Sequence, residues 1–151
     1  MSYVAKLAEM GYTMEKIELN TGRFFHAVQT GNLVFTSGQV SAWGDDVIKG
    51  KVGNGGISVE KAYTAAKYSA LNCIQAVHAL TGSADNIVQV VKVLGMVNVA
   101  QDFDDTPGCI HGASDLFLEV FGDAGKHARS AVGMTIPFNF AIEVEAVFEV
   151  K

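Results

Sequence analysis

The side chain in this sequence with the clearest chemical potential is that of Arg129. The 151-residue chain has only two arginines, Arg23 and Arg129, and a guanidinium is always charged near neutral pH and offers a planar fork of donors. Arg129 opens the stretch ARSAVGM, whose small residues leave room beside it. An ion pair with a carboxylate of the last strand is the alternative, since such pairs are common and stabilise little. The scarcity of arginine and the small neighbours favour a functional role.

The histidines form no recognisable metal site in the sequence. They are His26, His78, His111 and His127. No two of them are spaced i, i+4 on a helix with a third ligand, so we predict neither a metal nor a cofactor. Ser37 and His111 could join an acidic residue in a hydrolase triad, but the G-x-S-x-G nucleophile elbow is missing. We interpret His78 as an exposed helix residue, and His127 as either a loop residue or a contact at the rim of a site.

Two further features are interpreted as structural. Cys73 and Cys109 lack the spacing of metal ligands, which indicates reduced thiols in a cytoplasmic protein. The glycine-rich stretch KVGNGGIS matches neither G-x-x-x-x-G-K-[ST] nor G-x-G-x-x-G. A nucleotide site needs one of those spacings to present its backbone N–H groups, so we predict a surface loop instead.

Composition and charge exclude several classes of protein. Hydrophobic residues make up 49% of the chain and the formal net charge is −5. These values predict one globular domain over residues 1–151, and the helical pattern near the N-terminus marks residues 1–15 as a helical extension of it. A negative charge disfavours binding to nucleic acid or to an anionic membrane. The N-terminal residues have no long apolar run, so we expect neither a signal peptide nor a membrane span. We therefore expect a cytoplasmic protein.

Periodicity places these residues on a small set of elements. Glycine stops, capping residues and apolar spacing predict three helices and at least five strands. The helices are expected at 2–12, from Ser58 to about Leu80, and at 108–122. The first two strands are expected to form a hairpin within 22–40 that turns at Gly31-Asn32, and further strands are expected at 86–100, 128–134 and 141–150. Residues 42–57 are expected to be a loop with short strands at most. This order predicts an α+β fold with two main helices on one sheet.

The faces of two strands predict an interface. In the last strand Glu143, Glu145 and Glu149 alternate with apolar residues, so one face packs on the helices and the other carries carboxylates. The central strand, 87–99, is apolar on both faces. Helices on one side leave an apolar area on the other, and another subunit is its simplest cover.

The sequence resembles the reactive-intermediate deaminase (Rid, or YjgF-like) family. The pattern HARSAVGM…P…IEVEAV is similar to the family signature of an arginine opening a strand, a proline turn and a final E-[IV]-E-[AV] strand. Here these are Arg129, Pro137 and the strand that begins with Glu143. The resemblance covers roughly residues 24–150 and includes GNLVFTSGQV, AAKYSALNCIQAV and ASDLFLEVFG. It implies a chorismate-mutase-like fold, a mixed sheet that packs into a homotrimer, and sites in the clefts between subunits.

The resemblance also implies roles for single residues. Arg129 corresponds to the arginine that binds the carboxylate of a 2-imino acid, Glu143 to the glutamate that positions the hydrolytic water, and Ser37 to the serine of the TSGQ strand. An arginine beside small residues in a partly dry cleft suits a bidentate carboxylate contact.

Three positions depart from the family pattern. The tyrosine expected on the first strand is replaced by Phe24 or Phe25, and the cysteine two residues after the arginine by Ala131. The asparagine expected at the start of the second helix falls at His111 or Gly112. The turn between the arginine and the proline is also one residue shorter.

Two classes of function follow from the resemblance. The first is a hydrolytic deaminase of 2-imino acids or enamines, with substrate contacts from Arg129, Ser37, Phe24, Ala131 and His111 and catalysis by Arg129 and Glu143. The second is a binding or regulatory protein that holds a small carboxylate in the same cleft without turnover. The endoribonuclease label attached to relatives is disfavoured, because an acidic chain with two arginines is poorly equipped to hold RNA phosphates.

Overall fold

A mixed β-sheet and two long helices dominate the fold, described here from a computed structural model covering residues 2–151. In chain order the elements are α1 Tyr3–Glu9, β1 Ala27–Thr30, β2 Leu33–Thr36, β3 Gln39–Val40, β4 Ala42–Trp43, β5 Asp46–Val47, α2 Val59–Thr81, β6 Ile87–Asn98, α3 Thr106–Phe121, β7 Ala128–Met134 and β8 Ile142–Val150, with short 3₁₀ turns at Ala84–Asn86, Gly122–Gly125 and Pro137–Asn139. The helices and strands match the predicted ranges closely.

Capping residues define the ends of the two long helices. The side chain of Ser58 accepts a hydrogen bond from the Lys61 amide at the start of α2, and Gly82 ends that helix with φ 90°. Asp105 caps α3 in the same way by accepting from the Gly108 amide. Where α3 crosses α2, a Cβ on Gly112 would collide with the carbonyl oxygen of Tyr63, so glycine permits the close approach.

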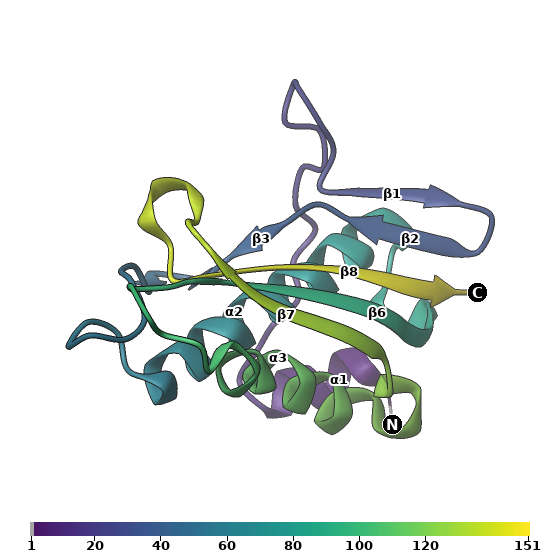
Figure 1. The fold of residues 1–151 in the computed structure, drawn as a ribbon. Coiled ribbons are helices and arrows are strands. Elements are labelled where there is room, and N and C mark those ends of the chain that lie inside the picture. The colour runs from purple at the N-terminus through teal and green to yellow at the C-terminus, as the bar shows by residue number, and fades with distance from the viewer. Residues whose placement is uncertain (1) are drawn as a thin grey trace.

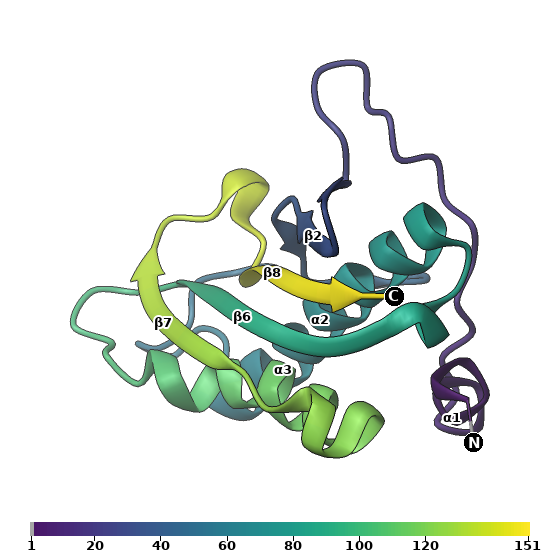
Figure 2. The ribbon, with the colours of Figure 1, turned by 90° about the vertical axis from the view of Figure 1, so that its right-hand side faces the viewer.

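The main sheet has the strand order β1-β2-β8-β6-β7, and the short strand β3 also pairs with β8. Strand β6 lies antiparallel to β8 and parallel to the edge strand β7. The sheet is therefore mixed, with β6 inside it, as expected for its apolar sequence. All three α-helices lie on one side of this sheet (Figures 1 and 2).

The two faces of the sheet have different surroundings. Toward the helices, Val93 of β6 and Val144 and Phe148 of β8 are fully buried in the core. The opposite face carries none of the three α-helices (Figure 2), and we call it the open face. Apolar side chains remain exposed there, including Phe35 at 45% and Val132 at 40%. This confirms the expectation that helices on one side leave an apolar area uncovered.

The start of the first hairpin differs from the prediction. Strand β1 begins at Ala27, and the residues before it form a projecting loop (Figure 1). In that loop the Thr21 hydroxyl accepts from the Phe24 amide at 3.1 Å and donates to the Phe24 carbonyl at 2.8 Å. Such a threonine turn competes with strand pairing. Phe24 and Phe25 therefore lie in a loop and not on the first strand.

None of the helices in residues 2–151 is both long enough and apolar enough to cross a membrane.

Candidate functional site

Arg129 lies on the edge strand β7 and reaches toward helix α3. It is paired in register with Val93, whose side chain is buried on the helix side of the sheet. Its Nη1 donates to His111 Nδ1 at 3.0 Å and to Ser114 Oγ at 3.2 Å. Within the described residues, 2–151, the ion pair that forms joins the exposed side chains of Lys126 and Asp123 and does not involve Arg129. The guanidinium therefore keeps its full positive charge beside neutral partners.

These contacts determine where the protons of the neighbouring groups lie. A guanidinium only donates, so His111 must accept through an unprotonated Nδ1. His127 Nδ1 lies 2.6 Å from the carbonyl oxygen of Gly125 and must donate to it. The Nε2 of a neutral His127 is then an acceptor, 2.9 Å from Ser114 Oγ. Ser114 thus accepts from Arg129 and donates to His127.

A hollow of about 360 Å³ opens beside these groups, and we call it the arginine hollow. Its lining residues are His111, Ser114, Leu118, Lys126, His127 and Arg129. None of them is acidic, although the chain as a whole has a net charge of −5. The hollow therefore has the charge and the donors to hold a small anion.

Glu143 lies on the open face, away from the arginine hollow. It pairs in register with Met96 of β6, next to Val97, whose buried side chain points to the helices. Its carboxylate lies against Gly38, where a Cβ would collide with it. Burial, with a smaller contribution from the charge of Glu145, raises the pKa of Glu143 above its ordinary value of 4.5.

Ser37 and the phenylalanine loop lie with Glu143 and not with Arg129. Ser37 precedes Gly38 and donates its hydroxyl to the carbonyl oxygen of Phe25 at 2.6 Å. Phe24 is 54% exposed and contacts the His26 ring edge-to-face at 5.9 Å between centroids. Because both candidate positions in this loop are phenylalanine, neither offers the hydroxyl of the tyrosine expected from the family pattern.

The predicted site residues thus form two groups within one chain. The arginine group contains Arg129, His111 and Ala131, which lies two residues along β7 on the helix side. The glutamate group contains Glu143, Ser37 and the loop of Phe24. The strands β7 and β8 are separated by β6, which puts them roughly 10 Å apart, and the two side chains point to opposite faces. One chain alone does not bring Arg129 and Glu143 together.

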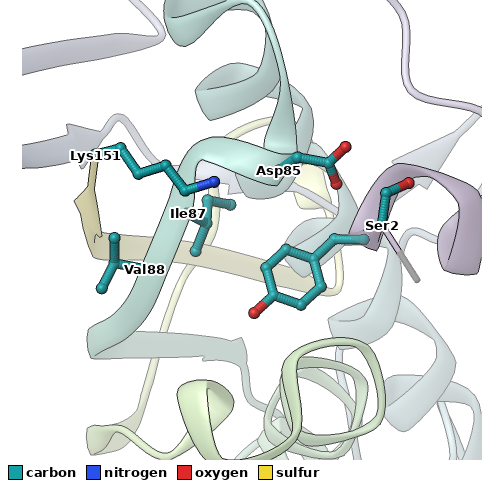
Figure 3. A pocket seen from close by; sticks show the side chains of 6 residues that line it. Ser2, Asp85, Ile87, Val88 and Lys151 are labelled. Carbon is teal, nitrogen blue, oxygen red and sulfur yellow. The ribbon is translucent and has the colours of Figure 1, made fainter.

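Other parts of the molecule offer less chemistry. A hollow of about 490 Å³ lies between α1 and the end of the sheet, beside Asp85 and Lys151 (Figure 3), and contains none of the predicted site residues. Burial raises the pKa of Cys73 to about 12 and that of Cys109 to about 11, so both remain thiols at neutral pH. No group of three or more histidine, cysteine or acidic residues in 2–151 is arranged to hold a metal ion.

Comparison with known proteins decides the family. A sequence model described as "YjgF/chorismate mutase-like, putative endoribonuclease" matches residues 5–148. The chain is a member of this YjgF-like family. Among its relatives, protein TCP17 of Trypanosoma cruzi is 32% identical over 152 residues, which cover 97% of this chain and 93% of that protein.

Solved structures of other proteins agree with the fold. The protein Atu1372 of Agrobacterium tumefaciens, whose function is unknown, has a TM-score of 0.88 at 33% identity, covering 99% of this chain and 92% of its own. The YjgF gene product of E. coli has a TM-score of 0.60 at 21% identity, over 90% and 94% of the two chains. The chorismate-mutase-like α+β fold implied by the sequence resemblance is confirmed.

Sequence reasoning missed part of the arginine group in this YjgF-like chain. Ser114 received no role, although His111, Ser114 and Leu118 share one helix face by their spacing of three and four residues. His127 was predicted to be either a loop residue or a rim contact, and it does line the hollow. His78 is half-buried instead of exposed, because its Nδ1 accepts from the Ala84 amide at 3.2 Å.

Proposed function

We propose that this protein hydrolyses 2-imino acids or enamines, with the substrate carboxylate held by Arg129. The supporting observation is an arginine that has no carboxylate partner within residues 2–151, in a hollow that has no acidic lining residue. A guanidinium in such surroundings binds a carboxylate through two parallel hydrogen bonds. In the proposed complex the ligand competes with His111 and Ser114, neither of which carries a negative charge.

The proposed site is shared between copies of the chain. Arg129 and Glu143 point to opposite faces of one sheet, so a substrate on Arg129 must meet the glutamate group of another copy. The exposed apolar side chains of the open face give such a copy a surface to cover. We propose a homotrimer, in which the arginine group of one subunit faces the glutamate group of the next, around a closed ring.

The proposed chemistry needs one base and one water. The Glu143 carboxylate accepts a proton from water as the oxygen adds to the C=N carbon, and that proton is returned to the nitrogen. The resulting amino alcohol transfers its hydroxyl proton to the nitrogen and loses ammonia, which leaves a ketone and the free carboxylate. Each turnover consumes one water and releases one ammonia. Because burial raises the pKa of Glu143, its carboxylate is a stronger base than an ordinary glutamate.

A binding protein without turnover is the second candidate. The loop that precedes β1 carries Phe24 and Phe25, which cannot donate a hydrogen bond to an imine or to water. Ala131 likewise provides no polar group. A site that retains its carboxylate contact and lacks these groups suits a receptor for a 2-keto or 2-imino acid.

Imine clearance separates the two candidates. An amino-acid oxidase generates the imine in situ, semicarbazide traps what remains, and added protein should reduce the trapped product. Arg129→Ala and Glu143→Gln should each abolish the effect, while Arg23→Ala, in the projecting loop, serves as the matched arginine control. Binding of a 2-keto acid with no clearance of any imine would favour the receptor instead.

A further inference from the structure

Ser114 has the hydrogen-bond arrangement of an activated hydroxyl. Its oxygen lies 2.9 Å from His127 Nε2, to which it donates when His127 is neutral, and one of its two lone pairs accepts from Arg129 at 3.2 Å. The second lone pair has no partner among the described protein groups, and Ser114 lines the arginine hollow. A hydroxyl with its proton on a base and a free lone pair toward a cavity can attack an electrophile.

The base is held rigidly in the tautomer that the attack requires. His127 Nδ1 donates to the Gly125 carbonyl at 2.6 Å, which leaves Nε2 free to take the serine proton. Gly125 itself is buried against α3, where a Cβ would collide with the carbonyl oxygen of Phe117. The Phe117 ring also contacts the imidazole edge-to-face at 5.8 Å between centroids. A nucleophile, a base and a fixed group that orients the base are the three parts of an activated serine.

The surrounding charge indicates which electrophile would fit. A positive guanidinium beside the oxygen stabilises negative charge on Ser114 and on an oxyanion formed next to it. The His111 ring accepts through Nδ1, so its Nε2 carries a proton and is a second available donor. The Arg129 guanidinium and the absence of acidic lining residues favour a substrate with its own negative group.

We propose that Ser114 is a nucleophile activated by His127, and that the arginine hollow hydrolyses small esters that carry a carboxylate. Ser114 Oγ bonds to the ester carbonyl carbon while its proton passes to His127 Nε2. The tetrahedral intermediate collapses, the bond to the leaving oxygen breaks, and His127 returns the proton to the departing alcohol. Water, deprotonated by His127, then releases the acid from the serine ester. This activity needs neither Glu143 nor imine chemistry.

The test uses covalent labelling and ester turnover on the intact protein. A small fluorophosphonate bonds to an activated serine with loss of fluoride, and mass spectrometry of the digested protein identifies the modified residue. Turnover is measured with the p-nitrophenyl half-ester of succinate, which keeps one free carboxylate, and with neutral p-nitrophenyl acetate. The variants are Ser114→Ala, His127→Gln and, as the matched control, Ser130→Ala. Ser130 is exposed on the same strand as Arg129, one residue along, and points to the other face.

We expect the label on Ser114 and a clear preference for the succinate half-ester. Ser114→Ala should abolish both labelling and turnover, and His127→Gln should slow them by roughly a hundredfold or more, while Ser130→Ala changes neither. Alanine favours helices, so Ser114→Ala should fold, which thermal denaturation checks. A folded protein that is not labelled at Ser114, or labelling that survives His127→Gln at full rate, would overturn the proposal. Binding of a 2-keto acid, measured by calorimetry, reports on the proposed imine site separately.

Discussion

At the scale of single residues, the partners of Arg129 matter as much as the arginine itself. A carboxylate partner would neutralise the guanidinium and compete with any anionic ligand. His111 and Ser114 instead hold it by neutral acceptors at 3.0 and 3.2 Å. Neither partner carries a negative charge, so an anionic ligand meets a guanidinium whose charge is not neutralised.

Replacing Arg129 by lysine should not be conservative. Lysine keeps the charge but loses the planar fork, so it cannot make two parallel hydrogen bonds to one carboxylate. We expect the affinity for a small 2-keto acid to fall by about 2–3 kcal/mol, the upper range for charged hydrogen bonds, with the fold unchanged. Calorimetric titration checks this, and Arg23→Lys is the control. Equal affinity in the wild type and in Arg129→Lys would remove Arg129 from the site.

The raised pKa of Glu143 predicts a pH-dependent effect on stability. Because the carboxylate ionises less readily in the folded protein, its charge costs stability once the pH exceeds the ordinary value of 4.5. Below that value the group is neutral in both the folded and unfolded states. Glu143→Gln should therefore match the wild type in acid and be more stable at neutral pH. Thermal denaturation from pH 4 to pH 8 measures this, and a constant difference across the range would contradict it.

Residue type alone could identify only part of the site. Arg129 and Glu143 are recognisable because of their charge and their positions on strands. Ser114 gives no such indication, since a serine in a helix becomes reactive only when a base is brought to it. That base, His127, comes from the turn that follows the helix, and only the folded backbone places it 2.9 Å away.

At the scale of elements, the crossing of α2 and α3 positions the arginine group. Helix α3 provides His111 and Ser114, and its distance from the sheet depends on how closely it approaches α2. Gly112 lies between these two residues and faces the Tyr63 carbonyl. A shift of α3 away from α2 would therefore move the partners of Arg129 as well as the packing.

Gly112→Ala should destabilise the protein despite the better helix propensity of alanine. The added methyl has no space against Tyr63, and overpacking of this kind costs roughly 1–3 kcal/mol or more. Urea denaturation should show this loss in the free energy of unfolding. Glu119→Ala, on the exposed face of the same helix, is the control and should change it little. An unchanged midpoint in Gly112→Ala would show that the helices can separate without cost.

Element positions were predictable wherever local pattern and tertiary packing agree. Ser58 and Gly82 mark the ends of α2 because capping positions favour particular residue types. The alternation of apolar and polar residues marks β8 because one face of that strand is buried. The start of β1 was not predictable in this way. The stretch before Ala27 is apolar enough for a strand, but the Thr21 turn diverts it into a loop.

At the scale of the whole molecule, the open face determines the expected assembly. Its exposed apolar side chains would remain in water in a single chain. The sequence does not give the register of the strands, and without it the face of the sheet to which each side chain points is unknown. The separation of Arg129 from Glu143 therefore follows only from the pairing of β6 with β7 and β8. A site divided in this way needs a second copy.

Light scattering should give a mass about three times that of the 16.0 kDa chain. Val132→Asp, which changes an exposed apolar residue of the open face, should lower that mass by placing a charge in the interface. Val132 lies on the open face and makes no contribution to the helix-side core. A monomer at micromolar concentration in the wild type would contradict the trimer and, with it, the shared site.

Mixing two inactive variants tests the shared site directly. Arg129→Ala keeps an intact glutamate group, and Glu143→Gln keeps an intact arginine group. If each site joins the arginine group of one subunit to the glutamate group of the next, unfolding and refolding an equal mixture should leave about one quarter of the sites with both groups intact. Imine clearance should then return to about a quarter of the wild-type rate, while each variant refolded alone stays inactive. No recovery from mixed trimers, verified by mass spectrometry of the intact assembly, would show that each chain must supply both groups itself.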